Sequence, residues 1–304
     1  MSVEDIIQKY NYSEDIANYL RKAYPALVRY FKNETIVHEA LMETPIVLTN
    51  NLYKCLLEHG FLNNDQDEGV VSYETLSVCA GVYHGEPIIK YNELKKEYSI
   101  ERVNRIVAIN AYSLIPHEYK GTLTHELCHL VKSYYNEYTI NGDTVEERSG
   151  LISRKYQLIF KDGKVCKKLW SETGVGLEEA FNAVAEEKIT SEIIGDPYKT
   201  NGYIVLRQIA KNILAYNIPN LHDIIIEAEM YHDNTRLESV LGPVFYEIMA
   251  FVDEIYPMVV KMSDINLGKD KRNEIAKEVE AIAEIKYKPL REKLKAIGQG
   301  TIVM

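Results

Sequence analysis

Two histidines and a glutamate near the middle of the chain have the spacing of a metal site. The segment His125-Glu126-Leu127-Cys128-His129 is an HExxH sequence. On a helix, His125 and His129 lie one turn apart on the same face, so both imidazoles can reach one Zn²⁺, with Glu126 beside them. Zinc lowers the pKa of its bound water to about 7, and a neighbouring carboxylate can take the proton as that water attacks a polarised carbonyl. The spacing therefore predicts a hydrolytic zinc centre with Glu126 as general base.

The pattern around this motif predicts the elements that must position it. Residues 121–135 have helical periodicity, with Thr122 or Thr124 as the N-cap. Residues 105–112 form a β-rich run with polar ends, which predicts a strand ahead of that helix. Residues 177–194 predict a further helix, which ends at a glycine.

The remaining sequence is mostly helical in pattern. Residues 156–160 and 165–170 flank Asp162-Gly163, a dipeptide that type I′ turns prefer, and so predict a hairpin. Residues 63–69 are polar and predict a loop, and Pro25 predicts a kink or break in a helix. The other predicted helices cover residues 3–10, 13–31, 50–59, 202–216, 221–230, 237–252 and 269–296.

We therefore expect an α+β, predominantly helical chain in three parts. An N-terminal helical lobe would cover residues 1–100, a mixed centre with a small sheet and the motif helix residues 101–200, and a C-terminal helical lobe residues 201–304.

A catalytic zinc usually has three protein ligands, so the motif needs a partner. Metzincins place Gly and His at fixed positions beyond the second histidine, and here those positions hold Lys132 and Tyr135, which excludes that subclass. The carboxylate-rich segment 174–186 is the better source.

Residues 103–186 resemble the gluzincin metallopeptidases, the thermolysin-like group in which a glutamate on a later helix completes HExxH. Gly176-Leu177-Glu178-Glu179-Ala180 matches the start of that helix in many relatives, Gly-x-x-Asn-Glu-Ala, if Glu178 replaces the Asn. The resemblance implies a zincin-like core and one Zn²⁺ held by His125, His129 and Glu179. After Glu179, the candidates for the third ligand are Glu178, and then Asp143, Glu146, Glu147 or no protein ligand. It also implies a peptidase, for which we expect endopeptidase rather than exopeptidase activity. The strand at 107–112 would then form the lip of the cleft and pair with extended substrate.

This chain differs from the gluzincin pattern at two positions. An acidic residue that orients a zinc histidine often stands four residues after the third ligand, where this chain has Ala183, so Asn182 or Glu186 would have to serve. The family's usual tyrosine for the oxyanion is replaced by the run 170–172, which contains none. Tyr203 and His232 are the candidates for that role.

Composition restricts the partners. The chain has 304 residues, of which 46% are hydrophobic, and a formal charge of −10, which argues against nucleic acid and anionic membranes as partners. We expect a peptide or protein substrate. No apolar run long enough for a membrane helix and no signal peptide is visible, which indicates a cytoplasmic protein and leaves export without a classical leader open.

The cysteines and tyrosines fit ordinary packing. The four cysteines are expected to be thiols, with Cys128 in the core rather than on the metal. The 23 tyrosines are expected mainly to replace phenylalanine on half-buried helix faces, with a phenol-rich pocket as the alternative.

The same residues are compatible with a second function. The chain could be an inactive zincin-fold protein that binds a partner or regulates it. Glu126 argues against this alternative, because a site that only binds zinc needs no base, whereas Ala183 argues weakly for it. Cleavage specificity and oligomeric state stay open.

Overall fold

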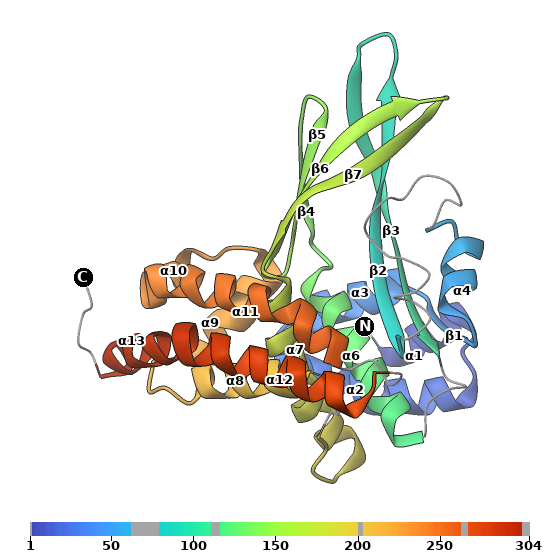
Figure 1. Cartoon of the computed structure of the whole chain (residues 1–304). Helices are drawn as coiled ribbons and strands as arrows, with labels where there is room; N and C mark the ends of the chain where they lie inside the picture. Colours follow the sequence, from blue (N-terminus) through green and yellow to red (C-terminus); the bar gives the residue numbers. More distant parts are fainter. Residues whose placement is uncertain (1, 62–78, 111–115, 200–202, 263–266, 300–304) are drawn as a thin grey trace. The chain divides into compact units, whose positions relative to one another are not determined.

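The chain is a mixed α/β protein with mostly helices, as predicted (Figure 1). It divides into two units. The computed structural model describes residues 2–61, 79–110, 116–199, 203–262 and 267–299, so the predicted loop at 63–69 lies outside the described residues. Unit 1 comprises Met1–Arg148, Arg154–Glu172 and Ala185–Lys199, and unit 2 comprises Ser149–Ser153, Thr173–Val184 and Thr200–Met304. The predicted three-part division at residues 100 and 200 stays a prediction.

Two helices of unit 1, at residues 34–43 and 52–58, begin where an asparagine caps them. The asparagines at 33 and 51 each accept a hydrogen bond from a backbone N–H in the first turn that follows. Pro25 lies inside a continuous helix, so of the predicted kink or break the break is wrong, and the kink stays a prediction. The helix at 34–43 was not predicted. These helices are α1 (Val3–Tyr10), α2 (Glu14–Phe31), α3 (Glu34–Glu43), α4 (Leu52–Glu58) and α6 (Pro116–Lys132).

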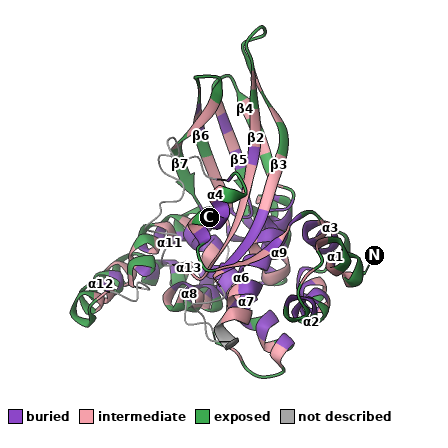
Figure 2. Cartoon of the chain, turned by 90° about the vertical axis from the view of Figure 1, so that its right-hand side faces the viewer, coloured by how far each residue is buried: buried purple, intermediate pink, exposed green. Residues whose placement is uncertain are grey.

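A three-stranded sheet packs against α6. Its strands are β1 (Ile46–Thr49), β2 (Gly81–Asn92) and β3 (Glu97–Asn110), in the order β1-β3-β2. β1 is parallel to β3 and β2 antiparallel to it. Residues 106–109 of β3 are buried, whereas β2 and β3 are more exposed toward the turn that joins them (Figure 2).

The position of β3 overturns one prediction. Residues 107–109 pair with β1 on one side and β2 on the other, and the backbone N–H of Asn110 donates to the carbonyl oxygen of Ala80, so these backbone groups are already used. The expectation that this strand pairs with substrate is therefore wrong for 107–110, and residues 111–112 lie outside the described part. Among the described strands of this sheet, β2 and β1 have the outer edges.

A second sheet contains the predicted hairpin. Its strands β4 (Glu137–Asn141), β5 (Thr144–Ser149), β6 (Ile152–Lys161) and β7 (Lys164–Thr173) lie in sequence order. Asp162 and Gly163 have φ values of 52° and 76°, the two positive values that a type I′ turn requires, so the predicted hairpin is confirmed. The pair β4 and β5 was not predicted.

Helix α7 (Val175–Ile194) contributes its first half to unit 2 and its second half to unit 1. Unit 2 otherwise consists of helices around an apolar core that includes Phe245, Ile248 and Phe251. Gly242, with φ 56°, divides the predicted helix 237–252 into two. These helices are α8 (Ile204–Leu214), α9 (Leu221–Tyr231), α10 (Thr235–Leu241), α11 (Pro243–Met262), α12 (Lys269–Ile282), the π-helical turn η1 (Ala283–Tyr287) and α13 (Lys288–Gly298). Of the helices described, none has the length and apolar character needed to cross a membrane.

Candidate metal site

Helix α6 holds the HExxH motif in the core of unit 1. It begins at Pro116, a residue that suits the first position of a helix, so Thr122 and Thr124 lie inside it and the predicted N-caps are wrong. Thr124 is buried, and its Oγ1 lies 2.6 Å from Oη of Tyr19 and accepts a 2.9 Å hydrogen bond from Oγ1 of Thr190. These contacts fix α6 against α2 and α7 next to the first histidine.

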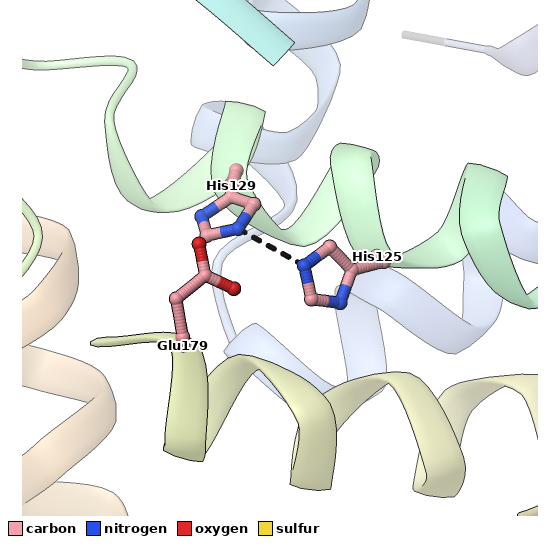
Figure 3. Close-up of side chains that lie close together, drawn as sticks. All are labelled: His125, His129 and Glu179. Carbon is pink, nitrogen blue, oxygen red and sulfur yellow. Dashed lines mark hydrogen bonds between the residues drawn. The ribbon is translucent and has the colours of Figure 1, made fainter. Parts of the chain in front are cut away.

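The two histidines of the motif direct the same nitrogen toward one another. Nε2 of His125 and Nε2 of His129 are 3.2 Å apart (Figure 3). Two nitrogens bound to one tetrahedral zinc at about 2.0–2.1 Å would lie about 3.3 Å apart. The spacing of this pair therefore fits a shared zinc ion without a rearrangement of α6.

Helix α7 brings Glu179 to the same place. Glu179, Glu186 and Thr190 are seven and then four residues apart, so they lie along one face of this unbroken helix, and the last two contact α6. One ligand atom from each of His125, His129 and Glu179 lies within 4.8 Å of the other two (Figure 3). The structure thus brings together the three residues that the sequence ranked first as ligands.

The alternative third ligands have other partners. Glu178 is 2% exposed, and its Oε2 accepts a 3.0 Å hydrogen bond from the backbone N–H of Leu151. The other three alternatives lie on or between the strands of the second sheet, where each carboxylate contacts a neighbouring side chain. These contacts are Gln157 to Asp143 at 2.6 Å, Lys155 to Glu146 at 3.7 Å and Tyr156 to Glu147 at 3.0 Å.

The first turn of α7 is anchored by a residue that the sequence did not reveal. Asp253 of α11 accepts hydrogen bonds from the backbone N–H groups of Gly174 at 2.6 Å and Gly176 at 2.9 Å. Both donors belong to the start of α7, where no earlier carbonyl of the helix can accept them. Asp253 therefore caps the helix one turn before Glu179, and its distance in sequence explains why no local pattern indicated it.

A carboxylate orients the first histidine. Oε2 of Glu186 lies 3.0 Å from Nδ1 of His125, and both side chains are buried. The carboxylate is an acceptor, so Nδ1 of a neutral His125 is the protonated nitrogen and Nε2 holds the lone pair that a metal needs. Of the two residues considered for this role, Glu186 is the one that makes the contact. Ala183, where the gluzincins often have an acidic residue, is buried.

Glu126 is held beside the histidines by the three-stranded sheet. Its Oε2 accepts a 2.6 Å hydrogen bond from the backbone N–H of Tyr83 in β2, and the residue is 8% exposed. A Cβ on Gly81 would lie 3.1 Å from Cγ of Glu126 and 2.8 Å from the Thr122 side chain. The glycine therefore allows β2 to approach α6 closely enough for this contact.

The two predicted oxyanion donors have other described contacts. Tyr203 is half-buried at the start of α8, and its ring centroid lies 6.2 Å from that of Tyr256. His232 is buried, with Nδ1 3.3 Å from the carbonyl oxygen of Gly150. These positions suit packing and a turn contact, and the oxyanion role of either residue stays a prediction.

The one cysteine of the HExxH motif lies in the core. Cys128 is fully buried, as expected for a packing residue, and the structure records all four cysteines as thiols. The donor set offered to a metal by the described residues is therefore two imidazoles and one carboxylate. This combination is typical of catalytic zinc sites that keep a fourth position for water or substrate.

Comparisons with known proteins do not add a family to this description. The chain matches no family model, no curated protein and no solved structure. Any function must therefore be argued from the residues themselves.

Proposed function

We propose that this protein is a zinc-dependent peptidase with His125, His129 and Glu179 as metal ligands. The observation that supports this most directly is the 3.2 Å separation of the two Nε2 atoms, with a Glu179 oxygen in the same 4.8 Å group. The Glu186 contact supports it further, because it selects the tautomer that leaves Nε2 of His125 able to bind a cation.

A zinc ion in this site would lower the pKa of a water and polarise the carbonyl of a peptide. Glu126 would take the proton of the attacking water and give it to the leaving amine nitrogen. Because the β2 backbone holds Oε2 of Glu126, we expect Oε1 to accept that proton. Tyr203 and His232 stay the candidates for stabilising the oxyanion.

The proposal includes a zincin-like core and endopeptidase action on a peptide or protein. Three elements around the motif support this. Helix α6 has the HExxH sequence, α7 has the third carboxylate, and the outer strand β2 contacts Glu126. An extended peptide could pair with such an edge through backbone hydrogen bonds.

The test compares metal content and cleavage in matched variants. Wild type, Glu126→Gln, Glu179→Ala and Glu192→Ala would be purified without chelator, assayed for zinc by mass spectrometry and incubated with a peptide library. Glu192 lies on the same helix as Glu179 but is exposed and paired with Arg29, so it serves as the control. We expect one zinc per chain and cleavage in wild type and Glu192→Ala.

The variants separate the two parts of the proposal. Glu126→Gln should keep its zinc and lose cleavage by at least about 100-fold, because only the base is removed. Glu179→Ala should lose most of its zinc. A wild-type protein that binds no zinc contradicts the whole proposal. Stoichiometric zinc without cleavage of any library peptide would instead favour the partner-binding alternative.

A further inference from the structure

The carboxylate behind His125 is itself held by a phenol. Oη of Tyr198 donates a 3.1 Å hydrogen bond to Oε1 of Glu186, while Oε2 of the same carboxylate contacts Nδ1 of His125. Glu186 is only 4% exposed. Both of its oxygens are therefore engaged, one by the histidine and one by the phenol.

The position of Tyr198 is set by contacts with α7. The residue follows the helix by four positions, and its backbone N–H donates a 2.8 Å hydrogen bond to Oγ of Ser191. That hydroxyl in turn donates to the carbonyl oxygen of Glu187 at 2.6 Å. The chain after α7 thus returns to the helix, which places the phenol over Glu186.

Helix α6 lacks a side chain where this phenol lies. A Cβ built on Gly121 would be 1.9 Å from Oη of Tyr198 and 3.0 Å from Oε1 of Glu186. Gly121 precedes His125 by four residues, so the two lie on the same face of α6. Glycine is unfavourable inside a helix, and the space that it leaves here is filled by the phenol.

We propose that Tyr198 is a positioning residue for the metal site, a proposal that rests on the zinc-binding function above. It fixes the Glu186 carboxylate, which fixes the ring plane and tautomer of His125. When the hydroxyl is removed, the carboxylate loses one of its two anchors and turns away from the geometry in which it accepts from Nδ1. The substitution should therefore lower the affinity for zinc and leave the stability of the metal-free protein nearly unchanged.

The test uses Tyr198→Phe, which removes one oxygen, with Tyr19→Phe as the matched control. Tyr19 also directs a buried hydroxyl at α6, but onto Thr124 rather than Glu186. Zinc dissociation constants would be measured by competition with a chromogenic chelator, the visible spectrum would be recorded with Co²⁺ in place of zinc, and melting would be followed in metal-free protein.

We expect Tyr198→Phe to weaken zinc binding about three- to tenfold and to change the Co²⁺ spectrum, whereas Tyr19→Phe leaves both unchanged. Gly121→Ala should also weaken zinc binding, because the added methyl group displaces the phenol of Tyr198. Combining Tyr198→Phe with Glu186→Gln should weaken binding no further than Glu186→Gln alone, since both changes act through the same contact.

Three results would overturn the proposal. Wild-type zinc affinity and an unchanged Co²⁺ spectrum in Tyr198→Phe would refute it while leaving the proposed metal site intact. Equal weakening in Tyr19→Phe and Tyr198→Phe, together with equal loss of melting temperature, would reduce the role of Tyr198 to folding. A wild-type chain that binds neither Zn²⁺ nor Co²⁺ would refute the metal site and this proposal together.

Discussion

Glu186 and His125 form a buried contact of 3.0 Å between Oε2 and Nδ1 that joins α7 to α6. The contact lies on the side of the imidazole opposite the nitrogen that faces His129. It therefore does two things at once: it sets the separation of the two helices and it decides which ring nitrogen has the lone pair. Such a contact connects the packing of the unit to the chemistry of the site.

Replacing Glu186 by Gln should weaken zinc binding. An amide can accept from Nδ1 only in one of its two orientations and lacks the negative charge that strengthens the ligand, so we expect the zinc dissociation constant to rise about 10- to 100-fold. The measurement is chelator competition at pH 7.5. Glu192→Gln, on the exposed side of the same helix, should retain the wild-type value. Equal affinities for the two variants would contradict an orienting role.

Alanine at the two glycines that flank α7 should have unequal effects. Gly174 and Gly195 have φ values of 86° and 76°, so both substitutions strain the backbone by about 1–2 kcal/mol. Only at Gly174 would the new Cβ lie 2.1 Å from the carbonyl oxygen of Leu151, since no heavy atom lies within 4 Å of a Cβ on Gly195. Overpacking should lower the free energy of unfolding of the Gly174→Ala variant by about a further 1–3 kcal/mol. Urea unfolding of the two variants measures this difference, and equal losses would contradict it.

Asp253→Asn should destabilise the start of α7. The carboxylate accepts from two backbone N–H groups, whereas the amide can offer one acceptor oxygen, so we expect the free energy of unfolding to fall by about 1–2 kcal/mol. Zinc affinity should fall as well, because Glu179 lies in the next turn. Asp270→Asn, at an exposed position in the first turn of α12, is the control. A variant with wild-type stability would show that these hydrogen bonds contribute little.

The ionisation of Glu86 should make the free energy of unfolding depend on pH in the acid range. Burial alone would raise the pKa of this carboxyl, but hydrogen bonding to His84 and the 2.6 Å ion pair with Lys167 outweigh it and lower the pKa from 4.5. A lowered folded-state pKa means that the contribution is present above about pH 4.5 and is lost as the pH falls through the folded-state value. Glu86→Gln should cost about 1 kcal/mol at pH 7 and progressively less below that range. Urea unfolding from pH 7 to pH 3 tests this; a difference that grows toward acid would contradict the sign.

Removing metal should lower the stability of the wild type. Binding to the folded state stabilises it by RT ln(1 + [L]/Kd), about 4 kcal/mol when free zinc is 1,000 times Kd. We therefore expect a chelator to lower the melting temperature of zinc-loaded protein by several degrees, and His129→Ala to show no such shift. Calorimetry with and without the chelator measures both. The same shift in the variant would mean that the metal binds elsewhere.

Local patterns predicted the parts of the site that depend on short stretches of sequence. The HExxH spacing is a property of one helical turn, and residues 177–194 have their own helical pattern and end at a glycine, so α6, α7 and the two histidines could be proposed without tertiary information. The choice of Glu179 depended on the resemblance to the gluzincins. The hairpin followed from Asp162-Gly163 in the same way.

Contacts between distant segments could not be predicted in this way. The backbone N–H of Tyr83 reaches Glu126 because β2 is an outer strand of its sheet, and no pattern near either residue indicates that pairing. The helix limits of α6 were also missed, since Pro116 rather than a threonine begins it. Gly121 leaves the space that Tyr198 fills, but the sequence places this glycine at the N-terminal end of the predicted helix, so it did not indicate the contact.

The division of α7 between the units has a consequence for how the chain is made. Unit 1 includes residues 185–199, so a ribosome must synthesise the chain past residue 186 before the helix that supplies Glu186 to His125 exists. A fragment that ends at Arg148 would contain the whole HExxH motif and lack both the orienting carboxylate and the third ligand. Shortened versions of this protein should therefore be cut no earlier than residue 199, and nascent chains released before that point would expose the face of α6 that α7 covers.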